Sequence, residues 1–209
     1  MEINKHIINF AGNPIFYSQK NPMASNKELD FLRKIKFRNN DFKIRPRFSK
    51  ESHILKYKQL KNIKKILLDN FNYYLNKVLE INNSFYICNS WATIQKKGNF
   101  HNGHHHPNHI FSAVYYAKAE KSSLIFQIEK SKIQEGFLFQ YNVKNYNYFN
   151  SSSWTLEVNS GDVLIFPVHL QHSSSICETD ERIVVGSSFF IKEKIGLEGD
   201  YNDTYLKGE

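Results

Sequence analysis

The chain has few cysteines and no long hydrophobic run. Two thiols, Cys88 and Cys177, occur in 209 residues without a CxxC pair. They could form one disulfide, but this usage is more typical of a reducing compartment. No stretch approaches the roughly 18 uncharged apolar residues of a membrane span, and no basic segment leads into an apolar run at the N-terminus. The sequence therefore predicts a soluble, cytoplasmic protein without a membrane partner.

Aromatic residues are abundant. Hydrophobic residues make up 41% of the chain and aromatic residues 15%, with 17 Phe and 12 Tyr. This composition is globular, and flat rings favour strands because they pack well on a pleated surface. The length suits a single domain over residues 1–209 with a sizeable core.

Positive charge is concentrated in the N-terminal part. Residues 1–80 hold 17 Lys/Arg and 7 Asp/Glu, a net of +10, whereas residues 81–209 hold 11 and 13, a net of −2. One interpretation is a surface for nucleic acid or an acidic partner. The other is a solvated helix face, which the scattered lysines and the lack of a nucleic-acid motif favour. A nucleic-acid partner is thus only weakly supported.

The N-terminal part has mainly helical patterns. Residues 7–18 predict two short strands around a turn at Gly12-Asn13-Pro14. Residues 26–37 predict a short amphipathic helix. Residues 53–80 carry apolar side chains at spacings of three and four and predict a long helix that faces the core.

From residue 84 onward the pattern is that of strands. Periods of two and continuous apolar runs are separated by turn residues, which predicts a sandwich or barrel. The fold class is therefore α+β, with a mainly helical layer over residues 1–80, a β core over 84–191 and a tail over 196–209. The predicted strands are residues 84–95, 109–119, 123–131, 136–143, 154–159, 162–168 and 182–193.

Five of the nine histidines fall within residues 101–109. In an extended chain His104 and His106 point to the same side, and such a pair can share a metal. His172 follows the predicted strand at 162–168 and is a candidate third ligand. Residue types alone leave zinc and iron open, and an exposed loop or an adventitious metal binder is the simpler alternative. His101 is the next candidate ligand.

Several short motifs occur in a recognisable order. They are Ser90-Trp91, Lys97-Gly98, His104-x-His106-Pro107-Asn108, Phe111-Ser-Ala-Val-Tyr-Tyr116, Ser160-Gly-Asp-Val-Leu-Ile-Phe-Pro167, His172 and Glu181-Arg182. With these motifs, residues 84–191 resemble the 2-oxoglutarate- and Fe(II)-dependent oxygenases, most of all a small group from bacteria and phages.

The resemblance implies a double-stranded β-helix (a jelly-roll or cupin-like core) that binds Fe(II), 2-oxoglutarate and O2. It implies a hydroxylase that releases succinate and CO2. The metal ligands would be His104, His106 and His172, and Arg182 would hold the far carboxylate of 2-oxoglutarate. Further expected site residues are Tyr116, Ser112 and Ser188 beside the cosubstrate, and Trp91 and Asn108 in the substrate pocket.

The chain departs from the family pattern at two positions. His106 stands where the usual facial triad has a carboxylate. It could complete a three-histidine site, act next to a ligand shell that water or a distant carboxylate completes, or mark a site that has lost activity. Val184 stands two residues after Arg182, where the family tends to have a serine, and it cannot hydrogen-bond a carboxylate. For Tyr116 and Trp91, plain core packing is the alternative role.

Two other functions stay open at this point. One is a three-histidine dioxygenase that uses no 2-oxoglutarate. The other is a non-catalytic β-barrel binding module with a degraded site. The substrate, a small molecule or a peptide, and the oligomeric state are not predicted.

Overall fold

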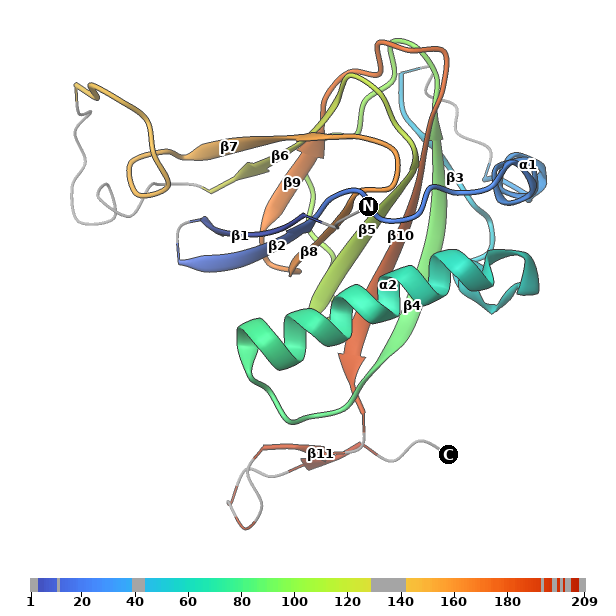
Figure 1. The fold of residues 1–209 in the computed structure, drawn as a ribbon. Helices are drawn as coiled ribbons and strands as arrows, with labels where there is room; N and C mark the ends of the chain where they lie inside the picture. The colour runs from blue at the N-terminus through green and yellow to red at the C-terminus, as the bar shows by residue number, and fades with distance from the viewer. Residues whose placement is uncertain are drawn as a thin grey trace.

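Two antiparallel sheets and two α-helices make up most of the part of the chain that the structure describes (Figure 1), and a two-stranded ribbon follows near the C-terminus. The computed structural model describes residues 4–10, 12–38, 44–128, 142–192, 194–196, 199, 201 and 204–206. None of the helices within these residues is long and apolar enough to cross a membrane.

The larger sheet has seven strands in the order β1-β2-β8-β5-β10-β4-β3, and the smaller sheet has three in the order β7-β6-β9. Both sheets are antiparallel throughout. The predicted pair of strands at residues 7–18 is confirmed, and its second strand extends the large sheet by pairing with β8. The bounds in the large sheet are β1 Lys5–Phe10, β2 Asn13–Ser18, β3 Arg47–Phe48, β4 Phe85–Gln95, β5 Phe111–Lys118, β8 Val163–Pro167 and β10 Arg182–Ile191, and in the small sheet β6 Ser122–Gln127, β7 Ser153–Val158 and β9 Gln171–Ser174.

Strand β5 shows how alternation divides the core. Phe111, Ala113 and Tyr115 belong to the cluster beneath the helices, whereas Val114 and Tyr116 belong to the cluster that also contains residues of the small sheet. Successive side chains on a strand point to opposite faces, so one strand serves both clusters. The inner face of the large sheet is therefore available for a site between the two sheets.

One helix, α2 (Lys61–Tyr73), covers the outer face of the large sheet, and the other, α1 (Asn26–Lys34), lies to the side of the sheet, beyond β3 (Figure 1). Helix α1 (Asn26–Lys34) begins with a capping box in which Ser25 and Glu28 bond each other's backbone. Helix α2 (Lys61–Tyr73) lies across β4, β5 and β10 (Figure 1). The helix predicted over residues 53–80 is correct in place but not continuous. It starts as two 3₁₀ turns, at 54–56 and 58–60, and ends as a π turn at 74–79.

Phe71 of α2 packs the helical layer against the large sheet, and its contribution to the free energy of unfolding can be measured. Its ring is 1% exposed and stacks on Phe189 of β10 at 3.7 Å between centroids. Phe71→Ala is expected to reduce the free energy of unfolding by about 3–5 kcal/mol, because it removes the ring and leaves a cavity. Chemical denaturation measures this. Phe149→Ala, at a ring that is 67% exposed, is the matched control and should change stability by less than about 0.5 kcal/mol.

Three expectations need correction or lie out of reach. His172 follows the strand at 162–168 after a short loop, as predicted, but it lies within a further strand, β9, that the sequence pattern did not predict. The strand predicted at 136–143 lies almost entirely outside the described residues. Part of the predicted tail is ordered as a ribbon, since β12 (Thr204–Tyr205) pairs with β11 (Lys194–Ile195).

Candidate metal centre and cosubstrate pocket

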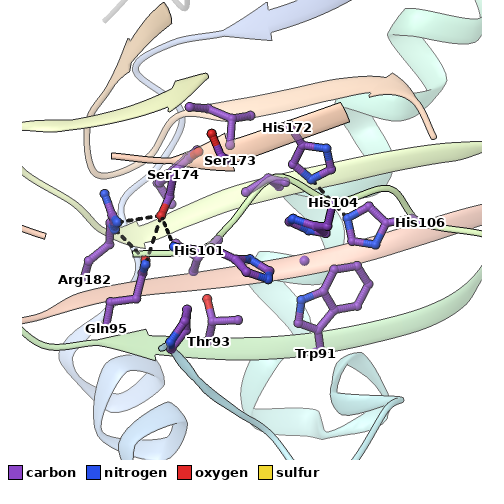
Figure 2. A pocket seen from close by; sticks show the side chains of 16 residues that line it. Trp91, Thr93, Gln95, His101, His104, His106, His172, Ser173, Ser174 and Arg182 are labelled. Atoms are coloured by element: carbon purple, nitrogen blue, oxygen red, sulfur yellow. Dashed lines mark hydrogen bonds between the residues drawn. The ribbon is translucent and has the colours of Figure 1, made fainter. Parts of the chain in front are cut away.

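Three histidines converge between the two sheets. His104 comes from the loop before β5, and its backbone exchanges two hydrogen bonds with His172 of β9, at 3.0 and 3.1 Å. His106 follows two residues later on the same side of the extended chain. The ligand nitrogens of His104, His106 and His172 all lie within 4.8 Å of one another (Figure 2). The sequence-predicted trio is thus brought together, and no carboxylate of the described residues joins it.

Two backbone carbonyls fix the tautomers of the His104 and His172 rings. Nδ1 of His104 lies 2.9 Å from the Asn102 carbonyl, and Nδ1 of His172 lies 3.0 Å from the Leu170 carbonyl. A carbonyl only accepts, so each Nδ1 carries the proton and each Nε2 keeps a free lone pair. This is the usual arrangement behind a metal-bound imidazole.

The distance between the Nε2 atoms of His106 and His172 also suits a single bound ion. Nε2 of His106 lies 3.2 Å from Nε2 of His172. Two imidazole nitrogens bound to one ion at about 2.1 Å, at right angles, would lie about 3.0 Å apart. Burial, followed by the charge of neighbouring imidazoles, lowers the pKa of His106 to about 3 and that of His172 well below its ordinary value. The rings are therefore neutral near pH 7, as metal ligation requires.

Arg182 is buried at one end of the same cavity. It is 2% exposed and lies on β10, on the face that looks toward the small sheet. Its Nε donates to Gln95 Oε1 at 2.6 Å, and its terminal nitrogens donate to the hydroxyls of Ser122, Ser174 and Ser175 and to the Ser175 carbonyl. Each of these hydroxyls accepts from Arg182 and still has a hydrogen of its own to donate.

This guanidinium has only neutral partners. In the described part of the chain no carboxylate forms an ion pair with Arg182, and burial lowers the pKa of its guanidinium. Buried charges in proteins are normally paired, because removing an ion from water is costly. A cavity that holds an unneutralised arginine is suited to an anionic ligand such as a carboxylate.

Comparison with known families covers both the histidine group and Arg182. Residues 89–188 match the profile of the family described as "Putative 2OG-Fe(II) oxygenase". This stretch includes all three histidines and Arg182. Over these 100 of its 209 residues the chain is similar to the 2OG-Fe(II) oxygenases. The cofactor and cosubstrates that the sequence predicted, iron, 2-oxoglutarate and O2, agree with this match and with the three-histidine group. A search of curated proteins gave no match.

Solved structures confirm the predicted fold. The alpha-ketoglutarate-dependent epimerase SnoN from nogalamycin biosynthesis is 10% identical, with a TM-score of 0.58 over 88% of this chain and 82% of its own. HygX from Streptomyces hygroscopicus, solved with nickel and 2-oxoglutarate, is 12% identical, with a TM-score of 0.53 over 93% and 92%. A Pseudomonas putida prolyl-4-hydroxylase is 12% identical, with a TM-score of 0.52 over 83% and 91%. The predicted double-stranded β-helix is thereby confirmed.

The structure brings only some of the other expected site residues to this cavity. Tyr116 and Trp91 line the cavity between the histidines and Arg182. Ser112 and Ser188 do not line it. They occupy paired backbone positions on β5 and β10, on the faces that look toward the small sheet. Their buried side-chain hydroxyls have no hydrogen-bond partner among the described residues. Asn108 is exposed in a turn, with φ of 68°, and lines neither this cavity nor the groove beside it.

The distance along β10 explains why Ser188 does not line the cavity around Arg182. Ser188 is six residues beyond Arg182 on β10, which corresponds to about 20 Å. A five-carbon diacid held by Arg182 cannot reach it. Gln95, Ser122 and Ser174 are the side chains that bond Arg182 instead. They come from three different strands, and the polar run Ser173-Ser174-Ser175 was their only indication in the sequence.

Trp91 is fixed over the floor of the cavity. A Cβ at Gly186 would lie 2.4 Å from Cε2 of Trp91, so only glycine permits the indole to lie on β10 there. The indole lies 5.1 Å from the His106 ring, between centroids. His101, stacked on His104 at 3.8 Å, lies between Trp91 and Arg182 in Figure 2.

Proposed function

We propose that this chain is an Fe(II)- and 2-oxoglutarate-dependent dioxygenase with a three-histidine metal centre. It would hydroxylate a small-molecule or peptide substrate and release succinate and CO2. One observation carries the proposal: three metal-competent imidazoles and a buried, unneutralised arginine line the same cavity. Relatives in this fold include an epimerase, so hydroxylation is the proposed outcome and not a property of the fold.

His104, His106 and His172 would hold the iron. Three neutral ligands leave the ion its full positive charge, and they leave coordination positions for other ligands. The carbonyls of Asn102 and Leu170 keep two of the rings in the ligating tautomer. When bound, iron and 2-oxoglutarate supply the oxidative decarboxylation that activates O2.

Arg182 would hold the far carboxylate of 2-oxoglutarate. The hydroxyl hydrogens of Ser122 and Ser174 can turn toward that carboxylate while their oxygens still accept from Arg182. Val114, Leu124 and Val184 line the cavity with apolar surface. They exclude water from the space between the two polar ends, which strengthens the electrostatic attraction at each end.

A three-histidine dioxygenase that uses no 2-oxoglutarate is the second candidate. The observation in its favour is that all five N–H groups of Arg182 already have acceptors within the protein. On this view Arg182 only ties β4, β6, β9 and β10 together. Binding of 2-oxoglutarate separates the two candidates.

The test is anaerobic loading with Fe(II), followed by 2-oxoglutarate and then O2. We expect one iron per chain, a new charge-transfer absorption when 2-oxoglutarate chelates it, and succinate after O2 is admitted. Succinate in place of 2-oxoglutarate is the control ligand and should give no such band. Iron binding without the band or succinate formation would favour the second candidate, and absence of iron binding would contradict both.

A further inference from the structure

A second groove reaches the histidines from outside the cosubstrate cavity. It has a volume of about 260 Å³ and shares Trp91, His101, His104 and His106 with that cavity. Its lining includes neither Arg182 nor any residue that bonds Arg182. A second small molecule in this groove could therefore lie beside the metal centre while the first occupies the pocket of Arg182.

The charge that this groove offers is positive. Arg38 lines it, is exposed, and has no side-chain hydrogen bond or ion pair within the described residues. Glu51 is the one acidic residue of the lining, and its carboxylate is already engaged by Lys56 Nζ at 2.7 Å and by the His53 N–H at 2.9 Å. Arg45, on the adjoining segment, is near enough for its charge to contribute to the lowered pKa of His101.

The groove also has an unused acceptor and two flat walls. Oδ1 of Asn89 is buried and has no hydrogen-bond partner. Leaving such a group unpaired costs about 1–3 kcal/mol, so a ligand that donates to it gains affinity. Phe48 and Trp91 form the walls, and each lies 5.1 Å, between centroids, from a histidine ring: Phe48 from His101 and Trp91 from His106.

We propose that this groove binds the substrate that is oxidised, and that the substrate is a small anion with a flat body. Its carboxylate or phosphate pairs with Arg38, its body lies between Phe48 and Trp91, and an N–H or O–H of the substrate donates to Asn89 Oδ1. This assignment rests on the proposed function for its catalytic meaning, but not for the binding itself. It gives the basic N-terminal part a specific role at one arginine.

Simple aromatic probes test the assignment. Benzoate, phenyl phosphate and the neutral benzamide are titrated into Zn(II)-loaded protein saturated with 2-oxoglutarate, so that Arg182 is already occupied. The readout is the indole N–H resonance of Trp91, with Trp154 of β7 as the internal reference. At least one of the two anions should shift the Trp91 signal with an affinity at least about tenfold higher than that of benzamide.

Variants decide whether Arg38 is responsible. Arg38→Gln should remove the preference for the anion and leave benzamide binding unchanged. Lys50→Gln is the matched control, because Lys50 is a nearby cation that does not line the groove. Equal affinities of the wild-type protein for anions and benzamide, or an unchanged preference in Arg38→Gln, would overturn the assignment.

A parallel titration of metal-free protein separates this inference from the proposed function. Arg38-dependent anion binding in protein that takes up neither iron nor 2-oxoglutarate would support the groove and contradict the function. Normal iron and 2-oxoglutarate binding, together with probe binding that ignores Arg38, would contradict the groove alone.

Discussion

His172→Ala is expected to abolish iron binding at stoichiometric concentrations and, with it, succinate formation from 2-oxoglutarate. The variant loses one of three candidate ligands, and the lost imidazole is the one packed deepest, at 3% exposed. Because even partners outside the ligand shell change metal affinity by about 10–100-fold, loss of a ligand should exceed about 100-fold. Anaerobic titration with Fe(II) or Zn(II) measures this directly.

The fold should survive this change. The backbone of residue 172 keeps its two bonds to residue 104 and its pairing with β6, neither of which needs the imidazole. We expect a loss of no more than about 2 kcal/mol in the free energy of unfolding. His169→Ala is the control, since His169 is exposed and bonds only Asn13. Wild-type metal affinity in His172→Ala would mean that β9 does not supply a ligand.

Arg182→Gln is expected to weaken 2-oxoglutarate binding by about 2–5 kcal/mol, which is at least about 30-fold in affinity. The buried guanidinium is the one cation in the cavity lining, so no other group can neutralise the far carboxylate there. Metal affinity should stay within about threefold of wild type, because Arg182 is not part of the histidine group. Calorimetric titration of the Zn(II)-loaded protein measures both quantities.

Two comparisons sharpen this result. Arg182→Lys keeps the charge but loses the fork of donors, so it should bind 2-oxoglutarate with intermediate affinity. Arg33→Gln changes an exposed arginine that pairs with Glu181, the neighbour of Arg182, and should leave 2-oxoglutarate binding unchanged. Undiminished binding in Arg182→Gln would favour the three-histidine enzyme that works without 2-oxoglutarate.

The regular elements were largely predictable because they follow simple periods. The strands predicted at 84–95 and 182–193 alternate or run apolar, and the structure confirms them as β4 (Phe85–Gln95) and β10 (Arg182–Ile191). Strand β9 was missed because Gln171-His-Ser-Ser174 has no apolar alternation. It forms a strand through its pairing with β6, which is a tertiary effect. The same holds for the short 3₁₀ and π turns that flank α2, since the apolar stripe there continues without a break.

The candidate site was predictable only in part. His104, His106 and His172 could be proposed from spacing and from the family resemblance, and the structure brings them together. The hydroxyls around Arg182 could not be proposed, because Ser122 and Ser174 lie 52 positions apart in the sequence and meet through the pairing of β6 with β9. Arg38 and Asn89 were missed for a related reason, as neither belongs to a recognisable motif.

The decisive measurement is an anaerobic crystal structure with Fe(II) and 2-oxoglutarate. We predict that Nε2 of His104, His106 and His172 each lie about 2.0–2.2 Å from the metal. The far carboxylate of 2-oxoglutarate should lie within hydrogen-bonding distance of Arg182. A metal bound without His106, or 2-oxoglutarate bound away from Arg182, would contradict the three-histidine oxygenase proposed here.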